Sequence, residues 1–138
     1  MTSIKTKACK ILHIDDDPDD QQLFRRAIRS INEHSQIIEA ADGAEGLEYL
    51  HSMKEINNLP CMIVLDINMP KVNGRETCIA IKKDEVLSTI PLIIFSTSSS
   101  MLDKLFFQKK NVEYITKPIE YNHIVDIAGA MLKQCKCN

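Results

Sequence analysis

A dense group of acidic residues directly follows an apolar run near the start of the chain. Five carboxylates fall within six positions of the segment ILHIDDDPDD, from Ile11 to Asp20. Carboxylates this close repel one another at neutral pH, and partial burial raises the cost of leaving them all ionised. A hard divalent cation offsets that repulsion, and Mg²⁺ best matches a site with few protein ligands and room for water.

The elements that must position these acids alternate regularly along the chain. Apolar runs typical of strands occupy residues 9–15, 35–42, 59–66, 90–96 and 111–116. Helical spacing of apolar residues follows each run, over residues 18–31, 43–54, 73–87, 101–110 and 119–134. Strict strand–helix alternation requires right-handed crossovers, so the predicted fold class is α/β, a parallel sheet with helices on both faces.

The start of the first helix is predicted from local chemistry. Asp17 and Pro18 suit the N-cap and the first helical position. Asp19 and Asp20 are interpreted as partners of the helix dipole rather than as ligands.

Polar residues stand where four of the predicted strands end. They are Asp15 and Asp16, Asp66, Ser96 and Lys117. Open parallel sheets bind ligands beyond the carboxyl ends of their strands, so we expect these residues at one edge. Acids with a metal ion, a lysine and a hydroxyl are what phosphoryl transfer to a carboxylate requires.

Bulk composition sets limits on partners. The chain has 138 residues, a formal net charge of −2 and an isoelectric point near 6.1. This balance gives no electrostatic reason to expect nucleic acid or an anionic membrane as a partner. The longest apolar runs, CMIVL and PLIIF, are too short to cross a bilayer, and MTSIKTKACK lacks a signal-peptide apolar region. A cytoplasmic protein is expected.

The cysteines are expected to be reduced. The five residues are Cys9, Cys61, Cys78, Cys135 and Cys137. Three of them lie in apolar segments, where reduced thiols pack as small apolar groups. The tail motif CKC could bind metal, but without another ligand cluster we interpret it as incidental.

Four motifs, taken in order, resemble the receiver domain of two-component response regulators. They are ILHIDDDPDD, MIVLDINMPKVNG, LIIFSTS and YITKPI. The similarity covers residues 9–135, with an extension at 1–8 and a tail at 136–138. The resemblance implies a flavodoxin-like (CheY-like) five-stranded parallel sheet of order 2-1-3-4-5, flanked by five helices. It also implies a stand-alone regulator that is not an enzyme and that catalyses only its own phosphoryl transfer and dephosphorylation.

The resemblance implies a role for each acidic residue of the edge. Asp66 would be the phospho-acceptor, supplied by a phosphohistidine on a sensor kinase. Asp16 would bind Mg²⁺ directly and Asp15 mostly through water. The backbone carbonyl of Asn68 would complete the protein ligands.

The resemblance also implies a switch. Ser96 matches the hydroxyl residue that moves on phosphorylation, and Tyr114 the aromatic that then turns inward. Lys117 matches the phosphate-binding lysine, and its bond to Pro118 is expected to be cis. Asn111 stands where receivers often have glycine, and asparagine tolerates the left-handed conformation.

Partners follow from the same resemblance. The surface of the fourth helix, fifth strand and fifth helix would be read by a target protein or a second copy. FSTS and DGAEGLEYL resemble a subgroup of regulators paired in part with phytochrome-like kinases.

Three alternatives remain open at the level of sequence. The first is a Mg²⁺-dependent phosphatase with an aspartyl nucleophile, although the D-x-D-x-T pattern is lacking at the first strand. The second is a flavin carrier, whose phosphate the acids would repel. The third is a degenerate receiver that serves only as a scaffold.

Overall fold

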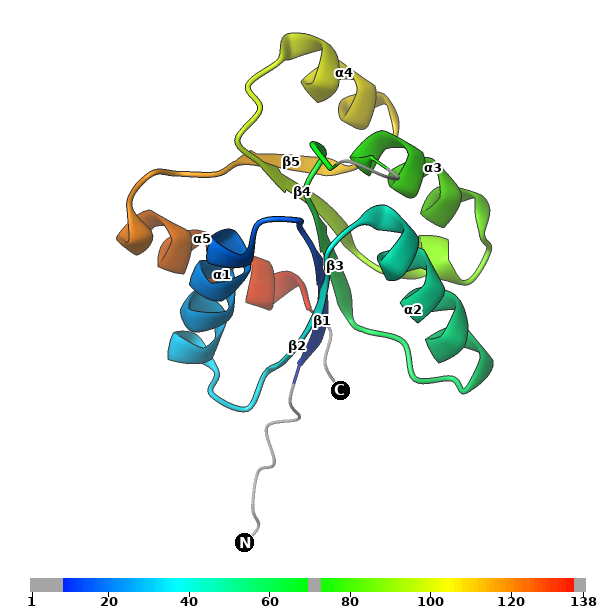
Figure 1. Ribbon diagram of the computed structural model, residues 1–138, viewed down its shortest axis with the longest axis horizontal. Helices are drawn as coiled ribbons and strands as arrows, with labels where there is room; N and C mark the ends of the chain where they lie inside the picture. The colour runs from blue at the N-terminus through cyan, green and yellow to red at the C-terminus, as the bar shows by residue number, and fades with distance from the viewer. Residues whose placement is uncertain (1–8, 70–72, 136–138) are drawn as a thin grey trace, which may run out of the picture.

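A computed structural model describes residues 9–69 and 73–135 of the chain, as a five-stranded parallel sheet with helices on both faces (Figure 1). The strand order is β2-β1-β3-β4-β5, as predicted. The strands are β1 (Lys10–Ile14), β2 (Gln36–Ala40), β3 (Met62–Leu65), β4 (Leu92–Ser96) and β5 (Glu113–Thr116). The helices are α1 (Pro18–Ile31), α2 (Gly43–Glu55), α3 (Gly74–Lys83), the short 3₁₀ helix η1 (Leu87–Thr89), α4 (Met101–Lys109) and α5 (Tyr121–Gln134). Residues 1–8, 70–72 and 136–138, with the predicted extension and tail, lie outside the described residues.

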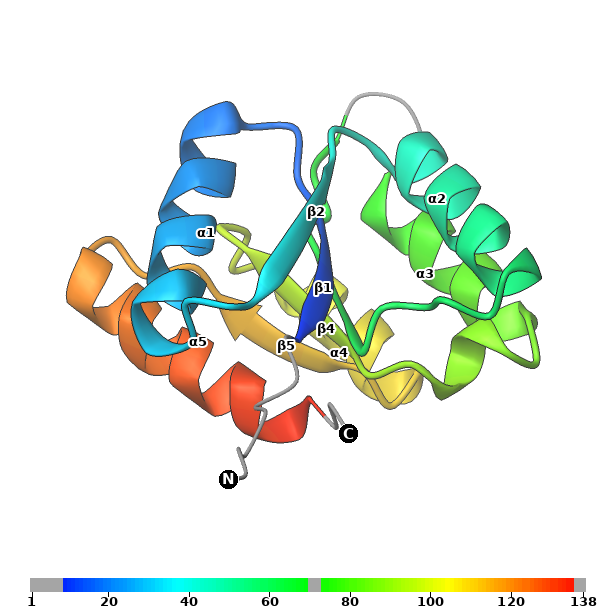
Figure 2. The same cartoon turned by 90° about the horizontal axis from the view of Figure 1, so that it is seen from below.

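The helices form two layers around the sheet. Helices α1 and α5 lie on one side, and α2 and α3 on the other (Figure 2). Alternate residues of β1 enter the two cores, because successive strand side chains point to opposite faces. Leu12 and Ile14 join the core beneath α2, α3 and α4, whereas Ile11 joins Phe24 and Met131 beneath α1 and α5.

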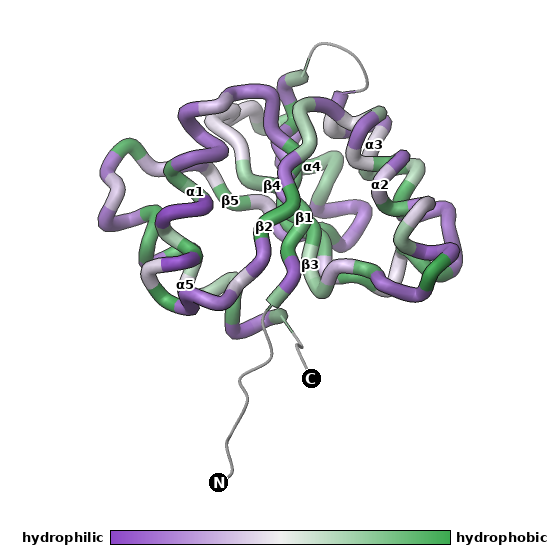
Figure 3. The backbone as a smooth tube through the Cα atoms, turned by 60° about the horizontal axis from the view of Figure 1, so that its bottom comes forward, coloured by the Kyte–Doolittle hydropathy of each residue, from purple (hydrophilic) through white to green (hydrophobic). Residues whose placement is uncertain are grey.

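Hydropathy follows this layering. Strand β3 is fully buried along its length, as is β4, and Figure 3 shows hydrophobic segments gathered in the central strands, with hydrophilic turns on the outer helices. Among the helices of the described residues, none is both long and apolar enough to span a membrane.

Strand register brings the expected residues to one edge. Ile14 pairs with Leu65, so that Asp15 and Asp66 leave neighbouring strands at the same level. The amide of Asp66 donates to the carbonyl of Ile14 (2.9 Å), which continues the ladder past both strands. Asp66 and Asp15 are therefore fixed side by side by backbone pairing.

Two predicted helix boundaries are confirmed. The carboxylate of Asp17 accepts a hydrogen bond from the Asp19 amide (2.9 Å), and Pro18 is the first helical residue. Asn111, after α4, has φ 58°, the left-handed conformation that asparagine tolerates. Helix α4 therefore ends without a glycine.

Helix α3 ends earlier than its apolar spacing predicts. It stops at Lys83, and Asp84 is the C-cap. The Asp84 carboxylate accepts hydrogen bonds from the amides of Val86 and Leu87, both at 2.9 Å. This local turn competes with helix continuation, which is why asparagine and aspartate favour turns.

The charge of Asp84 gives a pH-dependent prediction. The pKa of Asp84 is lowered from 3.8 to about 2. The largest cause is the hydrogen bond that Lys54 Nζ donates (2.8 Å), and the next is the hydrogen bond from the amide of Leu87. A carboxyl whose folded pKa is depressed stabilises the fold above its unfolded pKa, and this contribution is lost as the pH falls through the folded value. We expect Asp84→Asn to melt at a lower temperature than wild type at pH 7, with a gap that closes as the pH falls from 3.8 towards about 2. A melting gap of constant size over that range would contradict this assignment.

The expectation of reduced cysteines is confirmed for Cys78 and wrong for Cys9, Cys61 and Cys135, none of which is a free thiol. Cys78 is free and buried in α3. Cys61 and Cys135 form a disulfide, with Cα atoms 5.7 Å apart across a sequence separation of 74. Sequence alone does not show that the end of α5 returns to the start of β3. The bridge therefore depends on the tertiary fold.

Candidate functional site

Three carboxylates converge at the carboxyl edge of the sheet. Asp15 and Asp16 follow β1, and Asp66 follows β3; one oxygen of each lies within 4.8 Å of the others. Asp15 is fully buried, Asp66 is 8% exposed and Asp16 is exposed. The cluster is therefore held in the protein on one side and open to solvent on the other.

Backbone amides orient the two buried carboxylates. The amide of Asp17 donates to Asp15 Oδ1 (3.0 Å), and the amide of Ile67 donates to Asp66 Oδ1 (2.7 Å). In both residues the second oxygen, Oδ2, faces the ammonium of Lys117. The local turns after β1 and β3 thus leave one oxygen of each carboxylate for ionic contacts.

The start of α3 lies directly against this acidic edge. The amide of Gly74 donates to the carbonyl of Ile67 (2.9 Å). A Cβ at position 74 would lie 2.6 Å from the carbonyl oxygen of Asp66 and 2.5 Å from the Cα of Ile67. Only glycine permits this approach, so the helix start and the Asp66 backbone are fitted to each other.

Lys117 is the counter-charge of the cluster. Its Nζ donates to Asp15 (2.6 Å), Asp20 (2.9 Å) and Asp66 (3.4 Å), and its side chain is 8% exposed. Its amide donates to the carbonyl of Ser96 (2.8 Å), so the end of β5 is paired with the end of β4.

Asp20 is a site residue that sequence reasoning missed. It was interpreted as a dipole partner only, yet its carboxylate binds Lys117. The one sign in the sequence is that Asp20 lies in the first turn of α1, because that turn follows directly after the end of β1. The direction of the side chain, however, depends on how α1 packs.

The expected cis bond before Pro118 is wrong. Every peptide bond of the described residues is trans. Trans is the form that X–Pro bonds favour intrinsically, by about 0.5–1 kcal/mol. Lys117 reaches the acidic cluster with this trans bond.

Burial and pairing act in opposite directions on these groups. Burial raises the pKa of Asp15 to about 6, and the hydrogen bond and charge of Lys117 oppose the rise. Burial lowers the pKa of Lys117. The hydrogen bond and the charge of Asp15 raise it, as do the hydrogen bond of Asp20 and the charge of Asp66. Together these three carboxylates outweigh burial and hold the pKa above the ordinary lysine value. The lysine therefore stays charged.

Among the described residues, the side chains of the two residues expected to switch form no hydrogen bond with the three carboxylates. Ser96 is fully buried, and its Oγ accepts from the amide of Ser98 (3.3 Å). The half-buried Tyr114 donates its hydroxyl to the carbonyl of Ser98 (2.6 Å). Both residues therefore contact the loop after β4. Asn68 is exposed, two residues beyond Asp66.

The loop after β4 is also tied to α3 and α4. Ser98 Oγ donates to Asp103 Oδ2 (3.0 Å), and Asp103 forms an ion pair with Arg75. The hydrogen bond from Arg75 lowers the pKa of the Asp103 carboxyl. Ser98 thus joins Tyr114 to a charged pair between two helices.

His13, in the central strand, is a packed residue. It is 1% exposed, and its ring lies 4.4 Å from that of Phe24, centroid to centroid. Burial is the main cause that lowers the pKa of His13 to about 3, and the positive charge of Lys117 is the second cause. The ring is therefore neutral. Its burial leaves the ring without access to solvent.

The comparisons with known proteins agree with this geometry. The family model of the response regulator receiver domain matches residues 11–128. The chain is 27% identical to the protein PilH of Pseudomonas aeruginosa, over 89% of this chain and 97% of PilH. It is 30% identical to the response regulator Rcp1 of Synechocystis, over 78% of this chain and 75% of Rcp1. It covers only 15% of the sensor histidine kinase CheAY of Helicobacter pylori, at 28% identity.

Solved structures give the same result. The phosphorylated cyanobacterial phytochrome response regulator RcpA matches with a TM-score of 0.83 and 30% identity, over 93% of this chain and 94% of that one. The Mn²⁺-bound response regulator Rcp1 matches with a TM-score of 0.78 and 26% identity, over 89% and 91%.

The fold and the matched region define the class of protein. The chain belongs to the response regulator receiver-domain family of two-component signalling. Receiver domains are signalling modules rather than classical enzymes, and they bind Mg²⁺ or Mn²⁺ at an acidic pocket.

Proposed function

We propose that this chain is a stand-alone, cytoplasmic response regulator of a phosphorelay, and that Asp66 accepts the phosphoryl group from a sensor histidine kinase. The observation that carries the proposal is the approach of Asp15, Asp16 and Lys117 to the partly exposed Asp66 carboxylate. The match over 97% of PilH supports the stand-alone arrangement.

The donor set fits one Mg²⁺. Hard carboxylate and carbonyl oxygens are the ligands this ion prefers. Asp16, Asp66 and the Asn68 carbonyl would bind it directly, and Asp15 through water. When bound, the ion neutralises charge that develops on the phosphoryl oxygens.

The chain's own residues carry out the transfer. An Asp66 carboxylate oxygen attacks phosphorus, the bond from phosphorus to the kinase histidine nitrogen breaks, and its electron pair stays on the imidazole. Lys117 pairs with the charge of the transferred group, and the Ser96 hydroxyl donates to one of its oxygens.

The phosphorylated state is read through the face formed by α4, β5 and α5. Movement of the Ser96 hydroxyl towards the phosphoryl group takes it away from the amide of Ser98, which donates to it, and the carbonyl of the same Ser98 accepts the hydrogen bond of Tyr114. This contact supports a switch in which Tyr114 turns inward and the equilibrium between two arrangements shifts. Exposed apolar residues Met101 and Leu102 (68% and 74%) of α4 supply part of the surface for a target protein or a second copy.

The names of two similar structures support a phytochrome-like kinase as the partner. RcpA is a phytochrome response regulator, and AtBRR, at 26% identity and a TM-score of 0.73, is a bacteriophytochrome response regulator. Neither nucleic acid nor membrane is part of the proposed set of partners.

Phosphoryl uptake tests the proposal. Wild type incubated with a small phosphodonor and Mg²⁺ should gain about 80 Da, the mass of one phosphoryl group, in an intact mass spectrum. Asp66→Asn should gain nothing, because its amide is not a nucleophile. The exposed Asp126→Asn, in α5, is the matched control and should behave like wild type.

Two results would refute it. One is equal uptake by Asp66→Asn, which places the acceptor elsewhere. The other is absence of uptake by wild type with Mg²⁺, which leaves the scaffold alternative. Turnover of a chromogenic phosphate ester would instead favour the phosphatase alternative.

A further inference from the structure

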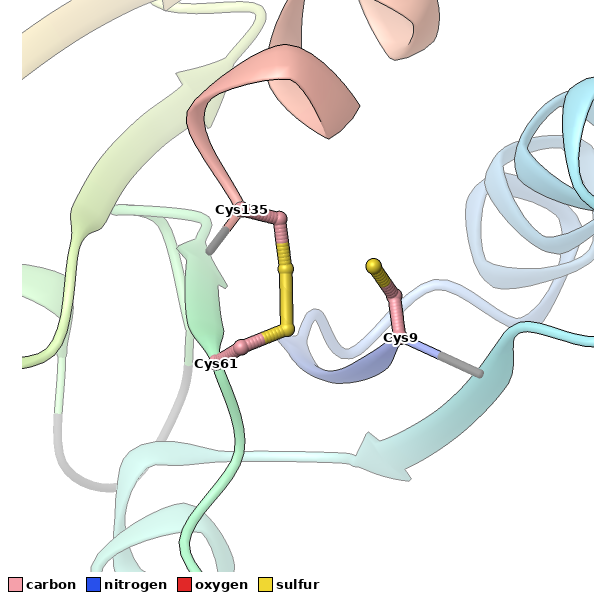
Figure 4. A group of neighbouring side chains, drawn as sticks. All are labelled: Cys9, Cys61 and Cys135. Carbon is pink, nitrogen blue, oxygen red and sulfur yellow. A yellow bond between two sulfur atoms is a disulfide. The ribbon is translucent and has the colours of Figure 1, made fainter. Parts of the chain in front are cut away.

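Three cysteines converge at the amino edge of the sheet, opposite the acidic cluster. Cys9 precedes β1, Cys61 precedes β3 and Cys135 follows α5. One sulfur of each lies within 4.8 Å of the others. Figure 4 shows the three side chains together, with Cys9 beside the Cys61–Cys135 bridge. We call this group the sulfur cluster.

Backbone pairing positions the sulfur cluster independently of any bond between sulfurs. The carbonyl of Cys9 accepts from the amide of Gln36 (2.7 Å), and the amide of Cys61 donates to the carbonyl of Lys10 (2.8 Å). The amide of Cys135 donates to Leu132 and closes the end of α5 (3.1 Å). The sheet and the last helix therefore bring the three residues together.

The surroundings limit access of water to the sulfurs. Cys9 is 6% exposed and Cys135 is 9% exposed, and both belong to the apolar core beneath α1 and α5. Cys61 is half-buried against the same core. A cation held here is therefore shielded from bulk solvent on the side of the core and reached only from the side of Cys61.

We propose that the sulfur cluster, in the reduced protein, binds one Zn²⁺ through Cys9, Cys61 and Cys135. Thiolates select soft and borderline cations, zinc among them, whereas Mg²⁺ prefers the oxygens of the opposite edge. Zinc–sulfur bonds of about 2.3 Å place the sulfurs of a tetrahedral site about 3.8 Å apart. The three sulfurs lie within 4.8 Å of one another, so once the disulfide is reduced a small separation of Cys61 and Cys135 is enough to reach this spacing. A convergence of thiols in a reducing compartment is more typical of metal binding than of a structural disulfide.

The disulfide is the oxidised form of this site. For each S–S bond of the cluster, a thiol reductant donates two electrons and two protons, the bond breaks, and the bonded cysteines become thiols while the reductant becomes its disulfide. Zinc then replaces the thiol protons of its ligands, which are released to solvent. Oxidation by a low-molecular-weight disulfide reverses both steps and expels the metal.

The fourth position of a tetrahedral site is open to water or another donor. The CKC motif, which begins at Cys135, is interpreted from the sequence as incidental because no second ligand cluster is evident there. The fold supplies that cluster in Cys9 and Cys61.

Metal content of the full chain tests the proposal. The protein is reduced with a phosphine, incubated with ZnCl₂ and excess Mg²⁺, and freed of unbound metal in a gel-filtration column. We expect one zinc per chain by atomic emission in wild type and in the control Cys78→Ala, whose thiol lies in α3. Alanine at Cys9, Cys61 or Cys135 should weaken zinc retention against a chelator by more than tenfold, because even an outer-shell partner contributes about 10–100-fold to metal affinity.

Two further readouts separate sulfur ligation from other binding. Co²⁺ in place of zinc should give thiolate-to-cobalt charge-transfer absorption and tetrahedral d–d bands in wild type, and these should disappear in the three variants. In wild type alone, zinc should slow alkylation of the three cysteines, mapped by peptide mass, so the test survives a variant that fails to fold. Absence of zinc from the reduced chain, unchanged retention in the variants, or alkylation indifferent to zinc would overturn the proposal.

Discussion

Lys117→Met is expected to lower the free energy of unfolding by about 3 kcal/mol in metal-free solution, because removing one partner of a buried ion pair leaves an uncompensated charge. Lys117 is 8% exposed, and it donates to two buried carboxylates, of Asp15 and Asp66. Its removal also raises the pKa of Asp15 further, and protonation of that group limits the loss. Urea denaturation in EDTA measures the change.

Lys54→Met is the matched control for this prediction. Lys54 also donates to a carboxylate at 2.8 Å, that of Asp84, but its side chain is 38% exposed. Water and salt screen an exposed ion pair, so only a small loss is expected. Addition of Mg²⁺ should reduce the loss in Lys117→Met and leave that in Lys54→Met unchanged. Equal losses in the two variants would show that Lys117 is not the counter-charge of the acidic cluster.

Gly74→Ala is expected to lower the free energy of unfolding by about 2 kcal/mol, the usual cost of forcing an extra methyl group into a packed site. The new Cβ would overlap backbone atoms of Asp66 and Ile67, which cannot rotate away as a flexible side chain would. The Asp66 backbone must therefore shift. Slower phosphoryl uptake, followed by intact mass, should accompany the loss of stability.

The opposite result is expected for Gly129→Ala. A Cβ there meets only Ile31 Cδ1, at an ordinary 3.6 Å, within the regular turns of α5. Alanine is better than glycine inside a helix by about 0.8–1 kcal/mol, so this variant should gain stability. Thermal melting of both variants makes the comparison. If Gly74→Ala also melts above wild type, the close approach of α3 to Asp66 is wrong.

Periodicity and strand ends were sufficient to predict the sheet and its acidic edge. The spacing of apolar residues sets the type of each element, and in a parallel sheet the carboxyl ends must share one edge. Asp15, Asp66 and Lys117 were therefore placed together by topology alone, without knowledge of any side-chain direction.

The parts that were missed depend on tertiary packing. The contact from Asp20 to Lys117 requires the packed position of α1, and the bridge from Cys61 to Cys135 requires the return of α5 to β3. Helix α3 ends at Asp84 because the Asp84 carboxylate accepts a hydrogen bond from the amide of Val86, and the spacing of apolar residues does not predict this contact. Each of these is an interaction between specific atoms, and it produces no repeating pattern of residues from which it could be predicted.

Helix α5 has one end at each of the two edges described above. It begins four residues after Lys117 and ends next to Cys135. Its 14 residues form a rod about 21 Å long. Under the two proposals above, zinc or a disulfide at the end of α5 would act on the same helix that forms part of the α4–β5–α5 face, so the redox or metal state of the sulfur cluster would be coupled to the response to phosphorylation of Asp66.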